Sequence, residues 1–359
     1  MFGEKRYPEN LSATDLDAYL SRGWYRMGQS IFTTHFLCFN DQFYSALWVR
    51  LSLKDYNFSK SLRKIVRRNY KQFDIKFREV DISEEKEILF QKYKKSFPGH
   101  LAPSLEDSLF EGFDGDIFET YETSIYDGDQ LIAFSFFDLG EDSVASILGV
   151  YDPDYNKHSL GLFTMLLEII FCKKNDFQYF YPGYVVPGNS RFEYKKRIGD
   201  VDYFDLRTGH WLSYAGLKPM DIPLSKMENK LLSLQNRLSE NSHSVNYYHY
   251  PLFEANLFGY WNAPYFDYPN FLLIKQDPKA KKYYVIVFDP REEAFLLIKC
   301  SEFDNVYFYF NSEFVNTFDK GKFFTELITT DGIIGESANE DDMVKMVNTL
   351  REVPVNEEK

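Results

Sequence analysis

Basic side chains crowd one predicted helix of this chain. Residues 59–72 read SKSLRKIVRRNYKQ, in which apolar residues recur at helical spacing and no acidic residue occurs. Such a helix face is either simply solvated or a surface that contacts phosphate groups. Since the whole chain carries a formal net charge of −13, this local excess of cations favours contact with a nucleic-acid backbone. The residues expected to make that contact are Arg63, Lys64, Arg67 and Arg68.

The sequence offers little for metal or nucleophile chemistry. Cys38, Cys172 and Cys300 lie far apart, and no two of them have a metal-binding spacing. A lone thiol cannot form a tetrahedral metal site, so we expect no bound metal. We also expect no cofactor. No Ser–His–Asp or Cys–His nucleophile signature is evident. The acidic net charge also argues against nonspecific coating of nucleic acid, and we expect no DNA partner.

A series of short motifs occupies residues 151–195. Asp152 either starts a turn with the proline that follows or recognises a positive charge. Ser159 is expected to cap the next helix, while Gly183 and Gly188 permit tight backbone. In chain order the motifs are Asp152-Pro153, Ser159-Leu160-Gly161, Tyr181-Pro182-Gly183-Tyr184 and Tyr194-Lys195.

This series resembles the C-terminal signature of the arginyl-tRNA–protein transferase family and its bacterial leucyl-transferring relatives. Two upstream stretches agree in the same order: residues 59–72 resemble the family's basic helix, and an earlier segment resembles its Gly-Trp-x-Arg-x-Gly element. The resemblance covers about residues 16–215. It departs from the family at Cys38, which stands where a cysteine cluster is common, and at Phe192-Glu193, which replaces a methionine. The early element is carried by Gly23, Trp24, Arg26 and Gly28.

The resemblance implies an enzyme that moves arginine or leucine from the 3′ ester of a charged tRNA to the N-terminal α-amine of acceptor proteins. Such a reaction tags proteins in an N-degron pathway and takes place in the cytoplasm. Aminoacyl-tRNA and acceptor proteins with free N-termini are the implied partners. Because the ester is already activated, the enzyme must orient the reactants, accept a proton and stabilise an oxyanion, without a covalent intermediate.

The resemblance also implies roles for residues of the signature. Tyr184 and Tyr194 would orient the amine or stabilise the oxyanion, and His158 is a possible proton acceptor. Lys195, with Arg191 nearby, would pair with an acidic side chain at the acceptor N-terminus. Each has a plainer alternative: core tyrosines, an exposed loop histidine and an ordinary surface cluster of cations. The remaining members of the expected substrate-binding set are Asp152, Ser159 and Gly183.

Hydrophobic periodicity and turn residues predict the elements that carry these side chains. A hairpin with its turn at Asp127-Gly128, a third strand, a helix and a further strand follow one another over residues 121–186. This order predicts a mixed α/β (α+β) fold, and the resemblance implies an acetyltransferase-like (GNAT-type) sheet flanked by helices. The loop of residues 155–161 has a single glycine, which disfavours acetyl-CoA as the donor. The other elements predicted before residue 216 are helices over 12–22, 59–72, 83–95 and 160–174 and a strand over 43–53.

Residues 216–345 are predicted to form an appended β-rich domain, which opens with a helix over 224–240. Its role is open between partner binding, closure over the site and simple packing. An acidic, frayed tail is expected over 346–359, and the expected units before the appended domain are an N-terminal module (1–58) and the transferase domain (59–215). The predicted strands are 271–276, 283–289, 294–300 and 306–310.

Two observations bear on membranes. Residues 161–172 form the most apolar stretch, but it is too short to span a bilayer and contains Glu168, so it predicts a buried helix. The first ten residues, MFGEKRYPEN, lack the apolar region of a signal peptide. We therefore expect no membrane partner.

Two alternatives to the leading hypothesis remain: an acyltransferase of the same fold with a different donor or acceptor, and an inactive family member that binds RNA or protein.

Overall fold

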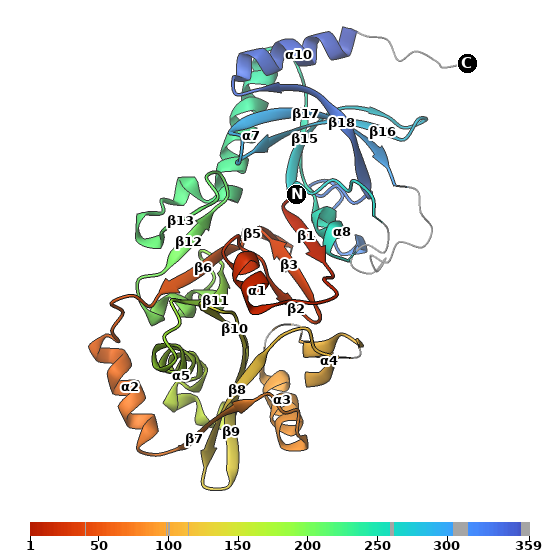
Figure 1. Cartoon of the computed structure of the whole chain (residues 1–359). Helices are drawn as coiled ribbons and strands as arrows, with labels where there is room; N and C mark the ends of the chain where they lie inside the picture. The colour runs from red at the N-terminus through yellow and green to blue at the C-terminus, as the bar shows by residue number, and fades with distance from the viewer. Residues whose placement is uncertain are drawn as a thin grey trace.

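The computed structural model describes residues 1–39, 41–97, 99, 101–113, 115–258, 262–303 and 315–352. Figure 1 shows a large sheet flanked by helices, a small N-terminal sheet in the middle and a second large sheet beside the C-terminal helix. The strand orders are β13-β12-β6-β11-β10-β9-β8-β7, β1-β3-β2, β4-β5 and β14-β15-β16-β17-β18. The prediction of a mixed α/β fold is therefore confirmed.

The eight-stranded sheet is antiparallel except where β10 pairs with β11 in parallel. The predicted hairpin is confirmed as β8 and β9, whose turn contains Gly128 at φ +60°. The strands are β6 (Leu47–Ser52), β7 (Asp74–Glu79), β8 (Thr120–Asp127), β9 (Gln130–Leu139), β10 (Ser143–Tyr151), β11 (Tyr179–Val185), β12 (Asp202–Asp205) and β13 (His210–Ser213).

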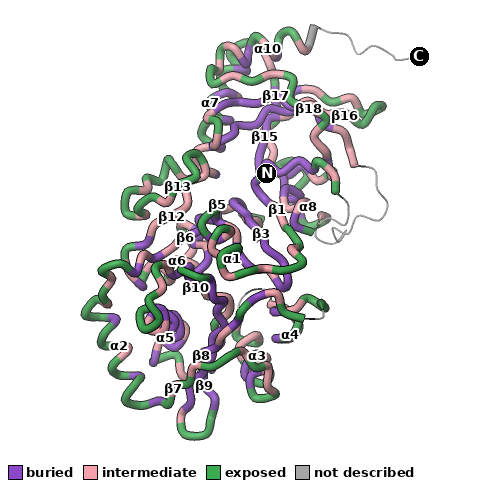
Figure 2. Tube along the Cα trace, viewed as in Figure 1, coloured by how far each residue is buried: buried purple, intermediate pink, exposed green. Residues whose placement is uncertain are grey.

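Helices cover both faces of this sheet. The predicted buried helix is α5 (Leu160–Lys174), which packs against β9 and β10 and is covered by α2 (Lys60–Tyr70). The other face carries α3 (Glu84–Ser96). Figure 2 shows α5 largely buried and α2 largely exposed. Strand β9 is buried on both sides, because alternate side chains point to opposite faces: Phe134 packs in a cluster with α3, and Phe137 in one with α5.

The N-terminal segment contributes to three sheets. Helix α1 (Ala13–Leu20) opens with a capping box formed by Ser12 and Asp15. The strand predicted over residues 43–53 is divided between two sheets, since β5 pairs only with β4 whereas β6 joins the large sheet. The remaining strands are β1 (Gly3–Arg6), β2 (Tyr25–Met27), β3 (Ser30–Thr34), β4 (Phe36–Phe39) and β5 (Gln42–Ser45).

The C-terminal sheet is antiparallel and packs against α7 (Pro223–Glu240) and α10 (Glu340–Glu352). The expectation of a frayed acidic tail is wrong for residues 346–352, which lie in α10. Carboxylates in its first turn suit the helix dipole, and Met343 and Val347 are buried. The strand predicted over 306–310 lies outside the described residues. The strands are β14 (Asn246–His249), β15 (Asn270–Asp277), β16 (Lys282–Asp289), β17 (Ala294–Glu302) and β18 (Ile328–Ser337).

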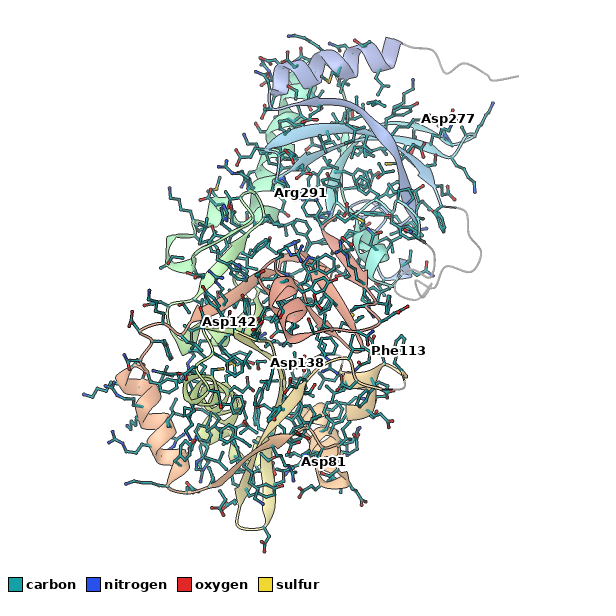
Figure 3. All side chains as sticks on the ribbon, viewed as in Figure 1. Asp81, Phe113, Asp138, Asp142, Asp277 and Arg291 are labelled. Carbon is teal, nitrogen blue, oxygen red and sulfur yellow. The ribbon has the colours of Figure 1, made fainter. Side chains whose placement is uncertain are left out.

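The C-terminal sheet shares its core with the start of the chain. Phe2 and Phe36 belong to the same buried cluster as the residues of β15–β17. The Phe2 amide donates to Asp267 Oδ2 at 2.6 Å, and the Arg291 guanidinium lies 4.0 Å from the centre of the Phe2 ring. Figure 3 shows Arg291 where the C-terminal sheet meets the N-terminal segment.

Candidate active site

The central strands of the large sheet diverge. β10 and β11 pair only through Ser143–Ala145 and Tyr179–Tyr181, after which β10 continues beside β9 and β11 beside β6. A register irregularity lies at the divergence in each of these outer pairings. We call residues 146–151 and 182–185 the fork. Residues 146–149 are half-buried or exposed although they lie in a central strand.

Tyr25 closes the apex of the fork. Its hydroxyl lies 2.5 Å from the carbonyl oxygen of Ser146 and 2.6 Å from that of Tyr181, so it bridges the two strands where they part. Its ring stacks on Trp48 with centroids 5.2 Å apart. Sequence reasoning overlooked Tyr25, although it occupies the variable position between Trp24 and Arg26 of the early element.

Arg26 anchors that element to the sheet. Its guanidinium pairs with the fully buried Asp138 at 2.9 Å and donates to the carbonyl of Leu109. Figure 3 shows Asp138 where the large sheet meets the N-terminal sheet. Burial raises the pKa of Asp138 and Arg26 opposes that shift. Arg26 therefore fixes the position of the neighbouring Tyr25.

Tyr184, Lys195 and Gly183 lie together beside the fork. Lys195 Nζ donates to the Tyr184 carbonyl at 3.2 Å, and burial lowers the pKa of its ammonium to about 8. Burial, with the charge of Glu254, raises the pKa of Tyr184 to about 12. Gly183 has φ +92°, and a Cβ there would lie 2.9 Å from Lys195 Nζ. Glycine is favoured here for its conformation, and a Cβ would force the Lys195 ammonium to shift.

Tyr194 begins the short helix η2 (Tyr194–Ile198), directly after α6 (Ser190–Glu193). The residue is 37% exposed, but burial of its hydroxyl, with the charges of Glu168 and Tyr151, raises its pKa to about 12. Tyr194 is therefore accessible to solvent and keeps its proton at neutral pH. Arg191 is exposed on α6. The motif thus brings Tyr184, Tyr194 and Lys195 to one region.

His158 lies elsewhere. It is buried, with its ring edge-on to Phe73 at 5.0 Å, and its carbonyl accepts from Arg68 and Asn69 of α2. The structure therefore corrects the expectation of an exposed loop histidine. Burial and the charge of Arg68 lower its pKa. In the described part of the chain it contacts no fork tyrosine, which argues against its role as proton acceptor.

Asp152 and Ser159 lie on either side of the turn that precedes α5. Asp152 pairs with Lys92 at 2.6 Å and accepts from the Asp154 amide, which favours its interpretation as a turn residue. Ser159 occupies the cap position of α5, but it has φ +55° and its side chain makes no cap hydrogen bond. The predicted serine cap of α5 is therefore wrong.

The predicted basic helix is confirmed as α2. Its four candidate cations are exposed, whereas Leu62 and Asn69 are buried. Arg68 donates to the His158 carbonyl at 2.7 Å and thereby ties α2 to the turn that precedes α5. The other three candidates, Arg63, Lys64 and Arg67, are exposed on α2, and this helix lies on the opposite side of α5 from the sheet (Figure 1).

Two carboxylates that the sequence did not single out lie near the tyrosines. Glu168, in α5, is fully buried and affects the pKa of Tyr25 and Tyr194. Glu254, from the C-terminal part, affects that of Tyr184. A glutamate inside the apolar run 161–172 was the available signal for the first, and no local pattern marks the second.

The described residues form no metal-binding cluster, and two depressions in the surface are lined by residues outside the fork. In the described part of the chain, no three His, Cys, Asp or Glu side chains are placed to hold a metal ion. A depression of about 460 Å³ lies at the start of β11, lined by Lys54, Lys173 and Tyr179 among others. Another, of about 270 Å³, includes Asp205, Lys226 and Glu293. Neither is lined by fork residues. No described helix is long and apolar enough to cross a membrane.

Comparison with known proteins identifies the family of this chain. The fold and site define the class: a mixed α/β protein whose forked strands, tyrosines, lysine and cationic helix suit group transfer from a phosphate-bearing donor. The sequence matches the family model "Arginine-tRNA-protein transferase, C terminus" over residues 85–205. The chain belongs to the arginyl-tRNA–protein transferase family.

Relatives and solved structures give the extent of the similarity. The chain is 30% identical to the aspartate/glutamate leucyltransferase of Leptospira interrogans serovar copenhageni, over 53% of this chain and 74% of that protein. It is 32% identical to that of Campylobacter jejuni, over 54% and 80%. Among solved structures, FemX is 10% identical with a TM-score of 0.34, over 55% and 68%. The L-PGS structure from Bacillus licheniformis is 16% identical with a TM-score of 0.31, over 41% and 48%.

Proposed function

We propose that this chain transfers an amino acid, arginine or leucine, from charged tRNA to the N-terminal α-amine of acceptor proteins. The observation that carries the proposal is the gathering of Tyr184, Tyr194 and Lys195 beside the fork in a chain of this family. The fork corresponds to the splayed strands of an acetyltransferase-like (GNAT-type) sheet. The reaction takes place in the cytoplasm, with aminoacyl-tRNA as co-substrate and without a metal or cofactor.

The tyrosines act as hydrogen-bond donors. With pKa values of about 12, both hydroxyls keep their protons at neutral pH. They can donate to the oxyanion that forms when the amine attacks the ester carbonyl. The fork, where β10 and β11 no longer pair with each other, gives space between the strands in which the two reactants are oriented. His158 has no part in this arrangement.

Lys195 recognises the acceptor. Its ammonium, with a pKa of about 8, is largely charged at neutral pH. Burial deprives this ammonium of water, and an acidic side chain at the acceptor N-terminus would compensate by accepting a charge-assisted hydrogen bond from it. The relatives named aspartate/glutamate leucyltransferases support acceptors that begin with Asp or Glu.

Helix α2 binds the tRNA acceptor arm. Its exposed Arg63, Lys64 and Arg67 present charge on the outside of α5, while Arg68 connects the helix to the turn before α5. Binding through phosphates positions the tRNA without reading its sequence. The aminoacyl end would then reach the fork past the start of α5.

The test is transfer of labelled arginine and leucine, each from its own charged tRNA, to peptides beginning with Asp, Glu, Arg or Lys. We expect label from one donor on the Asp and Glu peptides. The Lys195→Met variant should lose about tenfold or more in kcat/KM for those peptides. Binding of charged tRNA without transfer to any peptide would indicate instead an inactive family member that binds RNA. A thermal-shift response to CoA, without transfer from tRNA, would favour a different acyl donor.

A further inference from the structure

Glu168 is a buried acid without a counter-charge. It lies in the middle of α5 with 0% exposure, and neither carboxylate oxygen satisfies hydrogen-bond geometry with a described residue. Burying a polar group without partners costs stability. A purely structural residue at this position of an apolar helix would be expected to be apolar. Glu168 is therefore retained at a cost, which points to a role in function.

The surroundings of Glu168 connect it to the fork. The hydroxyls of Ser135 on β9 and Ser146 on β10 are near enough to lower its pKa, and Ser146 is a half-buried fork residue. The titratable groups that respond to its charge are Tyr25 of β2, Tyr194 of η2 and Cys172 one turn along α5.

The group is poised between its two protonation states. Desolvation raises the pKa of Glu168 to about 8, against the weaker opposing effect of the two serine hydroxyls. In the described part of the chain, no cation pairs with it to hold it ionised. An N-terminal α-amine in water titrates at about pH 8 as well. A proton could pass between the two groups with little change in free energy.

We propose that Glu168 holds the proton that the acceptor amine releases during transfer, and that the hydroxyl of Ser146 relays it. The inference rests on the proposed function. The acceptor ammonium gives one proton to the carboxylate, and the amine nitrogen then bonds to the ester carbonyl carbon. When the carbon–oxygen bond to the ribose breaks, the nitrogen loses a second proton and the ribose oxygen leaves as a hydroxyl. The carboxylic acid then returns its proton to solvent, so charge and atoms balance. Since Glu168 acts through Ser146, it is a positioning residue in the site.

The test is the pH dependence of single-turnover transfer in wild type and Glu168→Gln with the same peptide. We expect the variant to lose about 100-fold in rate where Glu168 is ionised. The ratio of wild-type to variant rate should rise with pH, reach half of its full value near pH 8 and level off above about pH 9, since only the ionised carboxylate accepts a proton. Titration of the peptide amine cancels in this ratio. Met165→Leu, one turn earlier on α5 and similar in volume, is the matched control and should keep the wild-type profile.

A second variant leaves the carboxylate in place. Ser135→Ala removes a hydroxyl that lowers the pKa of Glu168 and leaves both Glu168 and Ser146 in place, so the rise of the rate with pH should move to higher pH. This shift is expected even where Glu168→Gln does not fold. If Glu168 has only a structural role, the rise of the transfer rate with pH should not move in Ser135→Ala.

Other outcomes overturn the inference in distinct ways. A ratio that is constant with pH, together with an unmoved profile in Ser135→Ala, leaves Glu168 with a structural role. Loss of arginine transfer with normal leucine transfer at every pH would mean that Glu168 binds the donor guanidinium. Wild type that transfers neither amino acid would refute the proposed function as well, whereas active wild type with unchanged variants refutes this inference alone.

Discussion

At the scale of residues, the site depends on groups whose surroundings set their protonation. Tyr184 and Tyr194 keep their protons, whereas Lys195 and Glu168 both have pKa values of about 8. Burial accounts for each shift, because it disfavours the charged form of every one of these groups. The burial that shifts these pKa values also lowers the free energy of unfolding whenever one of these groups becomes charged in the folded protein.

Replacing Gly183 tests the contact with Lys195. Gly183→Ala should destabilise the protein by about 1–3 kcal/mol, because alanine is strained at φ +92°. It should also lower transfer, since its Cβ would displace the Lys195 ammonium. Gly188→Ala is the matched control: φ is +81° and nothing lies within 4 Å of a Cβ there. Thermal unfolding should show a similar loss in both, and activity should fall only at Gly183; equal activities would contradict the assigned contact.

Glu168 should make stability depend on pH. Its folded pKa, about 8, lies above the ordinary value of 4.5, so between these values the native state holds a proton that the unfolded chain releases. Stability therefore falls as pH rises from about 4.5 to about 8. Glu168→Gln removes this loss, and urea unfolding should show it more stable than wild type by on the order of 5 kcal/mol at pH 9, with a smaller advantage at pH 6. An equal difference at both pH values would mean that Glu168 is not the buried acid described.

At the scale of elements, α2 and α5 pack against each other but differ in exposure and charge. α5 is apolar almost all round and is enclosed between the sheet and α2. α2 buries only a narrow stripe and leaves its cations in solvent. The link from Arg68 to the His158 carbonyl couples the two elements near the start of α5.

Removing charge from α2 should weaken tRNA binding and spare the chemical step. The triple variant Arg63→Ala, Lys64→Ala, Arg67→Ala should raise KM for charged tRNA at least tenfold and make it less dependent on salt, because fewer counterions are released. The control is a double variant of the exposed Lys279→Ala and Lys320→Ala, which should match wild type. Filter binding across a salt series measures the effect, and an unchanged salt slope would leave α2 as a solvated face.

At the scale of the whole molecule, the C-terminal sheet is joined to the N-terminal segment by a common core. Phe2, Asp267 and Arg291 connect the two, and Glu254 extends the C-terminal part to the surroundings of Tyr184. The C-terminal part therefore supports the N-terminal strands that carry Tyr25, and it contributes charge beside the fork.

Breaking this connection should destabilise the molecule. Arg291→Met leaves the buried Asp289 without its guanidinium and removes the contact with Phe2. We expect a loss of about 2–3 kcal/mol in thermal or urea unfolding. Arg237→Met breaks an exposed pair with Asp341 and should have little effect. Equal stability of the two variants would argue against a fixed connection between the parts.

The sequence by itself determined the features that rest on local physics. Helical spacing and charge located α2 and α5, the Asp-Gly turn located the β8–β9 hairpin, and the ordered motifs identified the residues around Tyr184 and Tyr194. These features depend on neighbours a few positions apart, which a single sequence displays. The same local rules failed at Ser159, where the left-handed backbone replaces the expected cap.

Only the tertiary structure decided how distant residues combine. Tyr25, Ser146, Glu168 and Tyr194 are separated by up to 169 positions in the sequence, yet they surround one divergence of two strands. The burial of Glu168 and the position of His158 away from the fork both follow from packing against other elements. A pKa or a role of this kind is set by what surrounds a side chain in space, and no local pattern contains that information.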